Sequence, residues 1–257
     1  MLIDAHCHLD DEQFANDLDA VVARAEQAGV QAMITAGVDG ASSRRVVALA
    51  ERFTNVYAVV GIHPQHADTC SDDNLKTIRA LAAHRRVVGI GEIGLDLYWT
   101  QNPPRETQIK TLVTHLDLAA ELGKPVVIHN RNADDALMEI LRRPGVRPNA
   151  PTMRGILHCF SGDLAMAREA IDLGYLISFA GNVTFKNATR LQEIAQALPL
   201  EKIIIETDAP YLSPARGQRS EPANIARVAE KIAELKNIDA AMVEKMTTQN
   251  SRRLFGI

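Results

Sequence analysis

The amino-acid sequence predicts an α/β fold, a (β/α)8 TIM barrel built as a single domain over residues 1–257. Short apolar runs alternate with longer amphipathic segments along the chain, and eight such pairs can be counted. The apolar runs, for instance "KIIIET", are almost continuously hydrophobic, which is typical of parallel strands buried on both faces. Eight units of this kind favour a closed barrel, and a doubly wound open sheet is the structural alternative.

Turn-forming residues separate the expected elements, as at Gly29 and Gly174. Amphipathic periodicity predicts helices at Asp17–Ala28 and Arg105–Leu122. A last helix around Ala240–Leu254 is expected to pack on the outside of the barrel. The expected strands are Leu2–His6, Ala32–Ala36, Val56–Ile62, Val87–Glu92, Val126–His129, Gly155–His158, Leu176–Phe179 and Ile203–Glu206.

Composition restricts the classes of protein that the chain can belong to. Hydrophobic residues make up 46% of 257 residues, so the chain can bury a full core and is not expected to be disordered. The net charge of -4 argues against tight, nonspecific coating of nucleic acid. The three cysteines are widely spaced, no apolar run could span a bilayer, and no signal-peptide pattern opens the chain. These features predict a cytoplasmic protein with no membrane association, and the sequence gives no reason to infer an obligatory protein partner.

Polar residues with metal-binding or acid–base chemistry follow the predicted strands. In a (β/α)8 barrel the active site lies at the C-terminal ends of the strands. Five of the eight histidines stand at such ends. Buried charges need partners or a metal, so this convergence predicts a metal site. The residues at these ends are His6, His8, His63, Glu92, Asp96, His129, Arg131, His158, Glu206 and Asp208.

The stretch "DAHCHLD" places His6 and His8 two residues apart. Side chains at positions i and i+2 of a strand point to the same face, so the two imidazoles should project together. Neutral imidazoles are good metal ligands. The same alternation turns Cys7 away, and we expect Cys7 and Cys159 to be core residues rather than ligands.

Six motifs in this order, "DAHCHLD", "GIHP", "GEIGLD", "HNR", "HCFSG" and "ETDAP", resemble the TatD family of metal-dependent deoxyribonucleases. That family lies within the broader amidohydrolase-like metal hydrolases. The resemblance runs from Ile3 to the end of the chain and includes "RGQRSEPANI" and "NSRRLFGI". The family usually has Asn where this chain has Ser220, so the resemblance says less about the contacts of that loop.

The resemblance implies a site for two divalent ions, which in such sites lie about 3.5–4 Å apart. Nitrogen and oxygen ligands without thiolate suit zinc, manganese or magnesium. Histidine ligation favours zinc or manganese, whereas the family is generally assayed with magnesium or manganese, so the identity of the metal stays open. The implied ligands are His6, His8 and Asp208 for one ion, His129 and His158 for the other, and Glu92 as the bridge.

The expected reaction is hydrolysis of a phosphodiester by a metal-activated water. Asp208 is the predicted base that orients the water and takes up its proton, and Glu92 holds the two ions together. Glu206 is expected either to support the ligands or to be a core carboxylate paired with a lysine or arginine. The family resemblance suggests 3′–5′ exonuclease action on single-stranded DNA.

A phosphate substrate also needs cationic partners. Barrel enzymes often bind phosphate in the loops after strands seven and eight. Tyr98 and Trp99, in the loop after the fourth strand, are expected either to stack on a base or to cover the edge of the barrel. The predicted substrate-binding residues are His63, Arg131, Arg219, Lys186 and Arg216.

Two other functions fit the same residues. The metal cage would also suit hydrolysis of a small amide, lactone or phosphoester, for which replacement of Arg131 should have little effect. A metal-dependent binding protein without turnover is the alternative from another class, but it has no need of an activated water.

Overall fold

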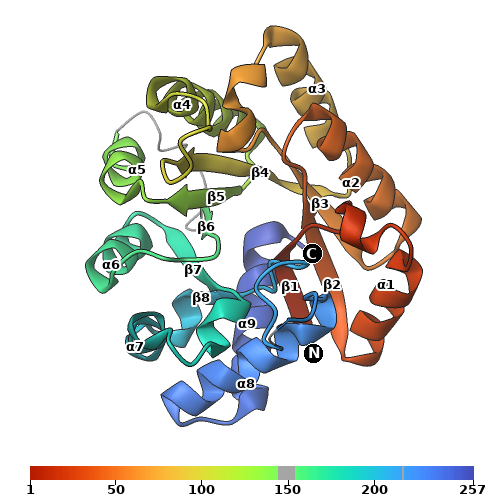
Figure 1. Ribbon diagram of the computed structural model, residues 1–257, viewed down its shortest axis with the longest axis vertical. Coiled ribbons are helices and arrows are strands. Elements are labelled where there is room, and N and C mark those ends of the chain that lie inside the picture. Colours follow the sequence, from red (N-terminus) through yellow and green to blue (C-terminus); the bar gives the residue numbers. More distant parts are fainter. Residues whose placement is uncertain (144–153, 216) are drawn as a thin grey trace.

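The strands of the computed structural model, which describes residues 1–143, 154–215 and 217–257, form one parallel sheet in chain order (Figure 1). Backbone hydrogen bonds join its two ends, from Asp208 N to the His6 oxygen at 3.0 Å and from His8 N to the Ala209 oxygen at 2.7 Å. The sheet is therefore a nearly closed barrel, which confirms the predicted (β/α)8 class. Its strands are β1 (Leu2–Cys7), β2 (Val30–Ala36), β3 (Val56–Val60), β4 (Val87–Asp96), β5 (Val126–Arg131), β6 (Gly155–Leu157), β7 (Tyr175–Phe179) and β8 (Ile203–Ile205).

Amphipathic helices cover the outside of the barrel (Figure 1). The last-but-one helix, for example, buries Ile225, Val228 and Ile232, which recur at the spacing of one helix face. None of the helices in the described ranges is long and apolar enough to cross a bilayer. The helices are α1 (Leu18–Gln27), α2 (Gly40–Arg52), α3 (Asp72–Ala82), α4 (Arg105–Leu122), α5 (Asp134–Leu141), α6 (Leu164–Asp172), α7 (Thr189–Ala197), α8 (Ile225–Lys236) and α9 (Ala240–Phe255).

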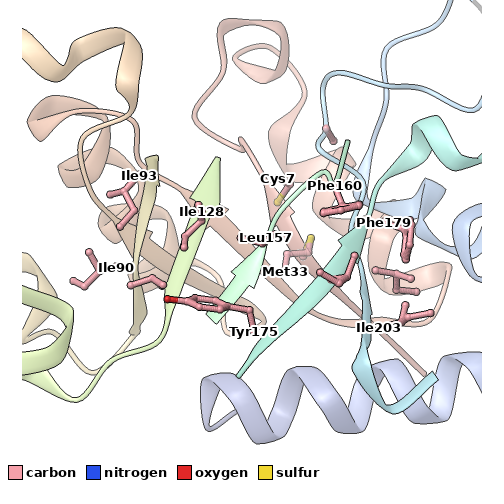
Figure 2. Packing of buried hydrophobic residues seen from close by; sticks show 14 of the residues in the cluster. Cys7, Met33, Ile90, Ile93, Ile128, Leu157, Phe160, Tyr175, Phe179 and Ile203 are labelled. Atoms are coloured by element: carbon pink, nitrogen blue, oxygen red, sulfur yellow. The ribbon is translucent and has the colours of Figure 1, made fainter. Parts of the chain in front are cut away.

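Two apolar clusters stabilise the barrel, one on each face of the sheet. The larger lies between the sheet and the helices, and Figure 2 shows part of it. Every strand contributes to the smaller cluster, so that cluster fills the interior of the barrel. Leu254 and Phe255, at the end of α9, join it from below. The predicted packing of the last helix on the outside therefore needs a correction at its C-terminal end. The strand residues of the interior are Ala5, Ile34, Ala36, Val59, Val88, Val127, Ile156, Leu176 and Ile204.

Strands β1 and β4 are irregular where they approach the mouth of the barrel. The register of β1 against β2 shifts between Asp4 and Cys7, and the register of β4 against β5 shifts between Ile90 and Ile93. Such bulges re-aim side chains and are common next to active sites. Gly94 has a φ of +148°, and a Cβ atom there would collide with the carbonyl oxygen of His129. Only glycine therefore lets β4 and β5 approach this closely.

The strand ends differ from the predicted ends by a few residues. Strand β4 runs to Asp96 rather than to Glu92, because residues 94–96 pair with residues 129–131 of β5. Strands β6 and β8 each end one residue earlier than predicted, at Leu157 and Ile205. Hydrophobicity marks the buried part of a strand, whereas its hydrogen-bonded end depends on the neighbouring strand.

We expect Ile204→Ala to lower the free energy of unfolding by about 2–5 kcal/mol, because it opens a cavity inside the packed barrel. Ile204 is fully buried. Urea denaturation followed by circular dichroism measures the loss. The matched control is Ile238→Ala, whose side chain is 39% exposed and which should change stability little. Equal losses in the two variants would contradict the interior packing.

Candidate metal centre

A cavity of about 820 Å³ opens at the C-terminal end of the strands. Its volume is in the upper part of the range of about 300–1,000 Å³ that is usual for ligand sites. The structure thus brings together, from distant parts of the sequence, most of the residues predicted from the strand ends. Those that line the cavity are His8, His63, Glu92, Asp96, His129, Arg131, His158 and Asp208, and His6 lies directly beneath them.

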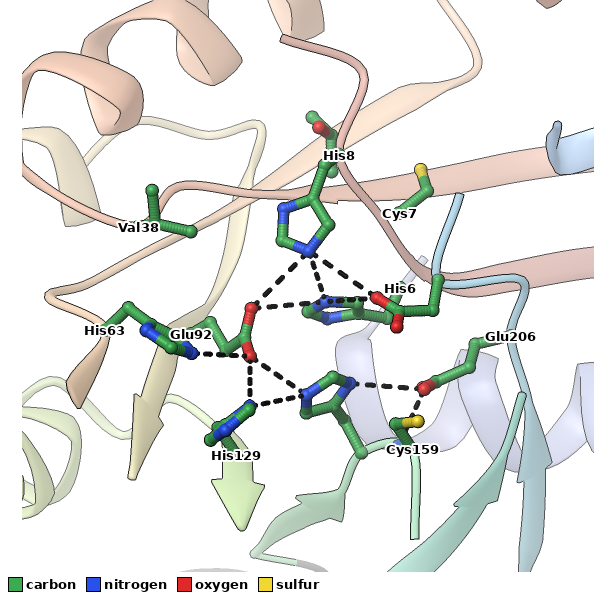
Figure 3. Close-up of polar contacts among 12 residues, drawn as sticks. His6, Cys7, His8, Val38, His63, Glu92, His129, Cys159 and Glu206 are labelled. Atoms are coloured by element: carbon green, nitrogen blue, oxygen red, sulfur yellow. Dashed lines mark hydrogen bonds and ion pairs between the residues drawn. The ribbon is translucent and has the colours of Figure 1, made fainter. Parts of the chain in front are cut away.

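Glu92 lies at the centre of the site, and its two carboxylate oxygens face different groups of histidines (Figure 3). Oε2 lies 3.4 Å from Nε2 of His6 and 3.6 Å from Nε2 of His8. Asp208 completes this first group, with Oδ1 3.7 Å and 3.6 Å from the same two nitrogen atoms.

The second group gathers around Oε1 of Glu92. This oxygen lies 2.8 Å from Nδ1 of His129 and 2.9 Å from Nε2 of His158. Nε2 of His63 is 3.4 Å from the same oxygen. His63, which was predicted to contact substrate, therefore lies among the potential ligands, and His63, Glu92 and His129 form one of the groups of donor atoms that could hold an ion.

The spacing of the donor atoms fits metal ligands. Two atoms bound to one tetrahedral ion at about 2.0–2.1 Å lie about 3.3 Å apart. Nε2 of His6 and Nε2 of His8 are 3.2 Å apart, and their distances to Glu92 and Asp208 are close to the same value. His6, His8 and Asp208 form one candidate group, and His6, Glu92 and His158 form another. The residues present therefore fit divalent ions.

The carboxylates draw positive charge into this buried site. Burial acts to lower the pKa of His8, yet the neighbouring Asp208 and Glu92 raise it to about 9. Burial acts to raise the pKa of Glu92, but His158, His63 and His6 hold it well below its usual value. By contrast, burial lowers the pKa of His63 to about 4, so this imidazole is neutral at pH 7. Divalent cations would supply the charge that the carboxylates demand while the imidazoles bind as neutral ligands.

Carboxylates behind the histidines fix their orientation. Oδ2 of Asp96 lies 3.2 Å from Nε2 of His129, and Oε1 of Glu206 lies 3.2 Å from Nδ1 of His158. Such partners set which ring nitrogen faces a metal. Glu206 also accepts hydrogen bonds from Ser178 Oγ at 2.5 Å and Cys159 N at 2.7 Å. Glu206 therefore contacts a predicted ligand rather than a lysine or arginine.

A buried aspartate holds the first and last strands in register at the site. Asp4 accepts hydrogen bonds from Thr207 N at 2.9 Å and from Thr207 Oγ1 at 2.6 Å. Burial raises the pKa of Asp4 to about 8, although these hydrogen bonds act in the opposite direction.

Next to Thr207, Asp208 adopts a left-handed conformation with a φ of +55°. Non-glycine residues pay about 1–3 kcal/mol for such a conformation, which aims the Asp208 side chain at His6 and His8.

The predicted substrate-binding residues do not all lie at the metal cavity. Arg131 lines the metal cavity, and its guanidinium carbon lies 4.2 Å from the ring centroid of Tyr98. Lys186 is exposed and lines a neighbouring cavity of about 950 Å³ that meets the first at Leu212. Arg216 falls outside the described residues.

The position of Arg219 does not support its predicted contact with substrate. Its guanidinium bonds Asp17 at 2.8 Å and Glu221 at 2.9 Å, and packs 4.5 Å above the Phe14 ring. It does not line the cavity formed by the described residues. Two carboxylates pair with this arginine, which ties the loop after β8 to the start of α1.

Sequence reasoning missed several residues at the rim of the cavity. Arg45 of α2 pairs with Asp10 at 2.9 Å, and Tyr211 Oη donates to Asp11 at 2.8 Å. Asn182 also lines the cavity. None of these residues ends a strand, so the signal that found the histidines could not find them. Only Tyr211 has a signal in the sequence, because it follows the predicted ligand Asp208 by three residues in "ETDAPY".

The chain resembles known proteins over its whole length. A model of the family described as TatD related DNase matches residues 3–256. The chain is 39% identical over 259 residues to the Bacillus subtilis protein named uncharacterized metal-dependent hydrolase YabD, and the alignment covers 100% of both. It is 34% identical over 264 residues to the 3'-5' ssDNA/RNA exonuclease TatD of Klebsiella pneumoniae, covering 100% of this chain and 98% of that protein. The crystal structure of YjjV, a TatD homolog from Escherichia coli K12, has a TM-score of 0.92 at 35% identity and covers 100% of this chain and 98% of that one.

We expect Asp96→Asn to weaken metal binding by about 10- to 100-fold, because the partner that orients His129 changes from a carboxylate to an amide. Isothermal titration calorimetry with manganese measures the affinity. The control is Asp73→Asn, whose parent side chain is 91% exposed on α3 and does not line the cavity formed by the described residues. An unchanged affinity in Asp96→Asn would show that Asp96 does not position the ligand.

We expect Arg219→Ala to lower stability chiefly above pH 4. A hydrogen bond from Arg219 depresses the pKa of Asp17 from 3.8 to about 2. A depressed carboxylate pKa contributes stability above the unfolded pKa, and this contribution is lost as the pH falls through about 2. Thermal unfolding between pH 7 and pH 2 should therefore show a shallower acid limb in the variant than in the parent. Arg227→Ala, at an exposed pair on α8, is the control.

Proposed function

Since the chain belongs to the TatD family of metal-dependent hydrolases, we propose that it is a two-metal deoxyribonuclease that shortens single-stranded DNA from the 3′ end. The observation that carries this proposal is the position of the Glu92 carboxylate. Its oxygen Oε2 faces one group of histidines, and its oxygen Oε1 faces another. A carboxylate in that position can serve two cations.

Each proposed ion has its own set of protein atoms. Divalent ions bound there would supply an acidified water and positive charge for the phosphoryl oxygens. The residue types do not select among zinc, manganese and magnesium, although imidazole nitrogens favour the first two. The proposed ligands are His6, His8, Asp208 and Glu92 for one ion, and Glu92, His129 and His158, with His63 adjacent, for the other.

Asp208 is the proposed general base. Burial acts to raise its pKa, but His8, His158 and His6 hold the pKa below its usual value, so the carboxylate is ionised at neutral pH. It also lines the cavity, so a substrate can reach it. In this role the Asp208 carboxylate orients the attacking water and takes its proton, which then passes to solvent or to the leaving oxygen.

A phosphodiester fits the cations at the mouth of the cavity. Arg131 lines the cavity with an exposed side chain, and Arg45 also lines it, although Asp10 partly neutralises Arg45. The name of the Klebsiella pneumoniae relative, a 3'-5' ssDNA/RNA exonuclease, supports a nucleic-acid substrate and this direction. With a net charge of -4, the protein would engage the end of a strand rather than coat a duplex.

A small, uncharged ester or amide is the second candidate substrate. Asp10, Asp11 and Glu12 line one side of the cavity and would repel an extended polyanion. The same metal cage can hydrolyse other electrophiles, because an activated water serves any of them. With such a substrate, Arg131→Ala should leave kcat/KM nearly unchanged.

We expect the purified protein to shorten a 5′-labelled single-stranded oligonucleotide stepwise with magnesium or manganese and to leave it intact with chelator. Asp208→Asn should lower kcat by about 10²–10⁴-fold, because it removes the proton acceptor. Gel electrophoresis of the labelled products gives both the rate and the direction.

Asp73→Asn serves as the matched control and should retain full activity. Intact DNA in the presence of bound manganese would contradict the nuclease proposal and direct a screen toward small esters, amides and phosphoesters. Full turnover by Asp208→Asn would instead remove Asp208 from the role of base.

A further inference from the structure

Two aromatic side chains stand exposed at the rim of the metal cavity. Tyr98 is 47% exposed and Trp99 is 41% exposed, and their ring centroids lie 4.8 Å apart at an angle of 85°. The guanidinium carbon of Arg131 lies 4.2 Å from the Tyr98 centroid and 5.3 Å from the Trp99 centroid. Trp99 and Arg131 both line the cavity. We call Tyr98, Trp99 and Arg131 the aromatic platform.

Hydrogen bonds hold the backbone that carries Tyr98 and Trp99 beside the site. Asp96 Oδ1 accepts a hydrogen bond from Tyr98 N at 3.1 Å, and Asn102 N donates to the Trp99 oxygen at 3.1 Å. Asn102 Nδ2 donates to the Asp96 oxygen at 3.0 Å. The other carboxylate oxygen of Asp96 faces His129. A single residue therefore fixes both the platform and a proposed metal ligand.

The alternative role of these rings, covering the edge of the barrel, fits the structure poorly. A side chain that seals a core is buried, and in this loop the partly buried Leu97 packs against the larger apolar cluster. Tyr98 and Trp99 are two of the exposed large hydrophobic side chains of the described protein; Trp99 lines the metal cavity, and Tyr98 packs against Arg131, which also lines it. Exposing such rings costs free energy unless a ligand covers them.

We propose that the aromatic platform stacks one unpaired base of a nucleic-acid strand whose phosphodiester lies at the metal centre. The inference rests on the proposed function and adds the part of the site that selects single strands. Stacking on aromatic rings tolerates any base, because every base has a π face, and arginine adds a cation–π contribution. A base inside a duplex is already covered on both faces and cannot reach Trp99 without unpairing.

Trp99 is the sole tryptophan of the chain, so its fluorescence reports on the platform directly. The first experiment titrates the full-length Asp208→Asn protein, with manganese present and cleavage suppressed by the substitution, with a short single strand. A single strand of the same length made of abasic sites, and a blunt duplex, are titrated in parallel. We expect saturable quenching by the single strand and at least about fivefold weaker binding of the abasic strand and of the duplex.

The second experiment compares variants with metal present. Trp99→Ala should raise KM for the single strand by about 5- to 150-fold, which corresponds to about 1–3 kcal/mol per stacked base. Trp99→Phe keeps an aromatic face and should restore most of the lost affinity. On the abasic strand the two variants and the parent should have the same KM. Met242→Ala, which removes an exposed apolar side chain on α9, is the control and should match the parent on both substrates.

Equal quenching by the single strand and the abasic strand would contradict the stacking proposal. A Trp99→Ala variant with the parental KM on both substrates would contradict it as well. These results are distinct from failure of the proposed function. If the parent cleaves no DNA but base-dependent quenching persists, the platform stands and the nuclease proposal fails. If the parent cleaves DNA and Trp99→Ala has no effect, the nuclease proposal stands and the platform fails.

Discussion

The Glu92 carboxylate is the constraint on which the rest of the site depends. Its two oxygens stand 2.8–3.6 Å from nitrogen atoms of five histidines, which lie in β1 and β5 or directly after β1, β3 and β6. An ionised carboxylate with so little exposure would be very costly without this positive or metal-binding surrounding. The bulge in β4 and the glycine at position 94 allow Glu92 to project between the two groups.

Two buried carboxylates behind the histidines, Asp4 and Glu206, connect neighbouring strand ends by hydrogen bonds. Asp4 ties β1 to the segment after β8, and Glu206 ties β6 and β7 to that same segment through Cys159 and Ser178. Neither carboxylate lines the cavity, so each acts on the site through its neighbours. The same hydrogen bonds therefore help to close the barrel and to position the donor atoms of the metal centre.

The fold and the donor atoms could be predicted from sequence because each leaves a local signal. Alternating apolar runs mark the strands, and the polar residues that end them must converge in a barrel. The roles of Asp96 and Arg219 leave no such signal. Asp96 faces His129 only because β4 continues past Glu92, and Arg219 meets Asp17 across about two hundred residues of chain. Both contacts depend on which segments pack together in the folded protein, and the spacing of residues in the sequence does not show this.

The packed interior of the barrel has a consequence for how substrate and product move. Side chains from all eight strands, closed from below by Leu254 and Phe255, leave the described barrel no tunnel beneath the metal centre. A released product must leave through the same opening by which substrate enters. The neighbouring cavity that meets the first at Leu212 widens that opening on one side. Because one opening serves both directions, exit of product and entry of the next substrate molecule compete for the same space.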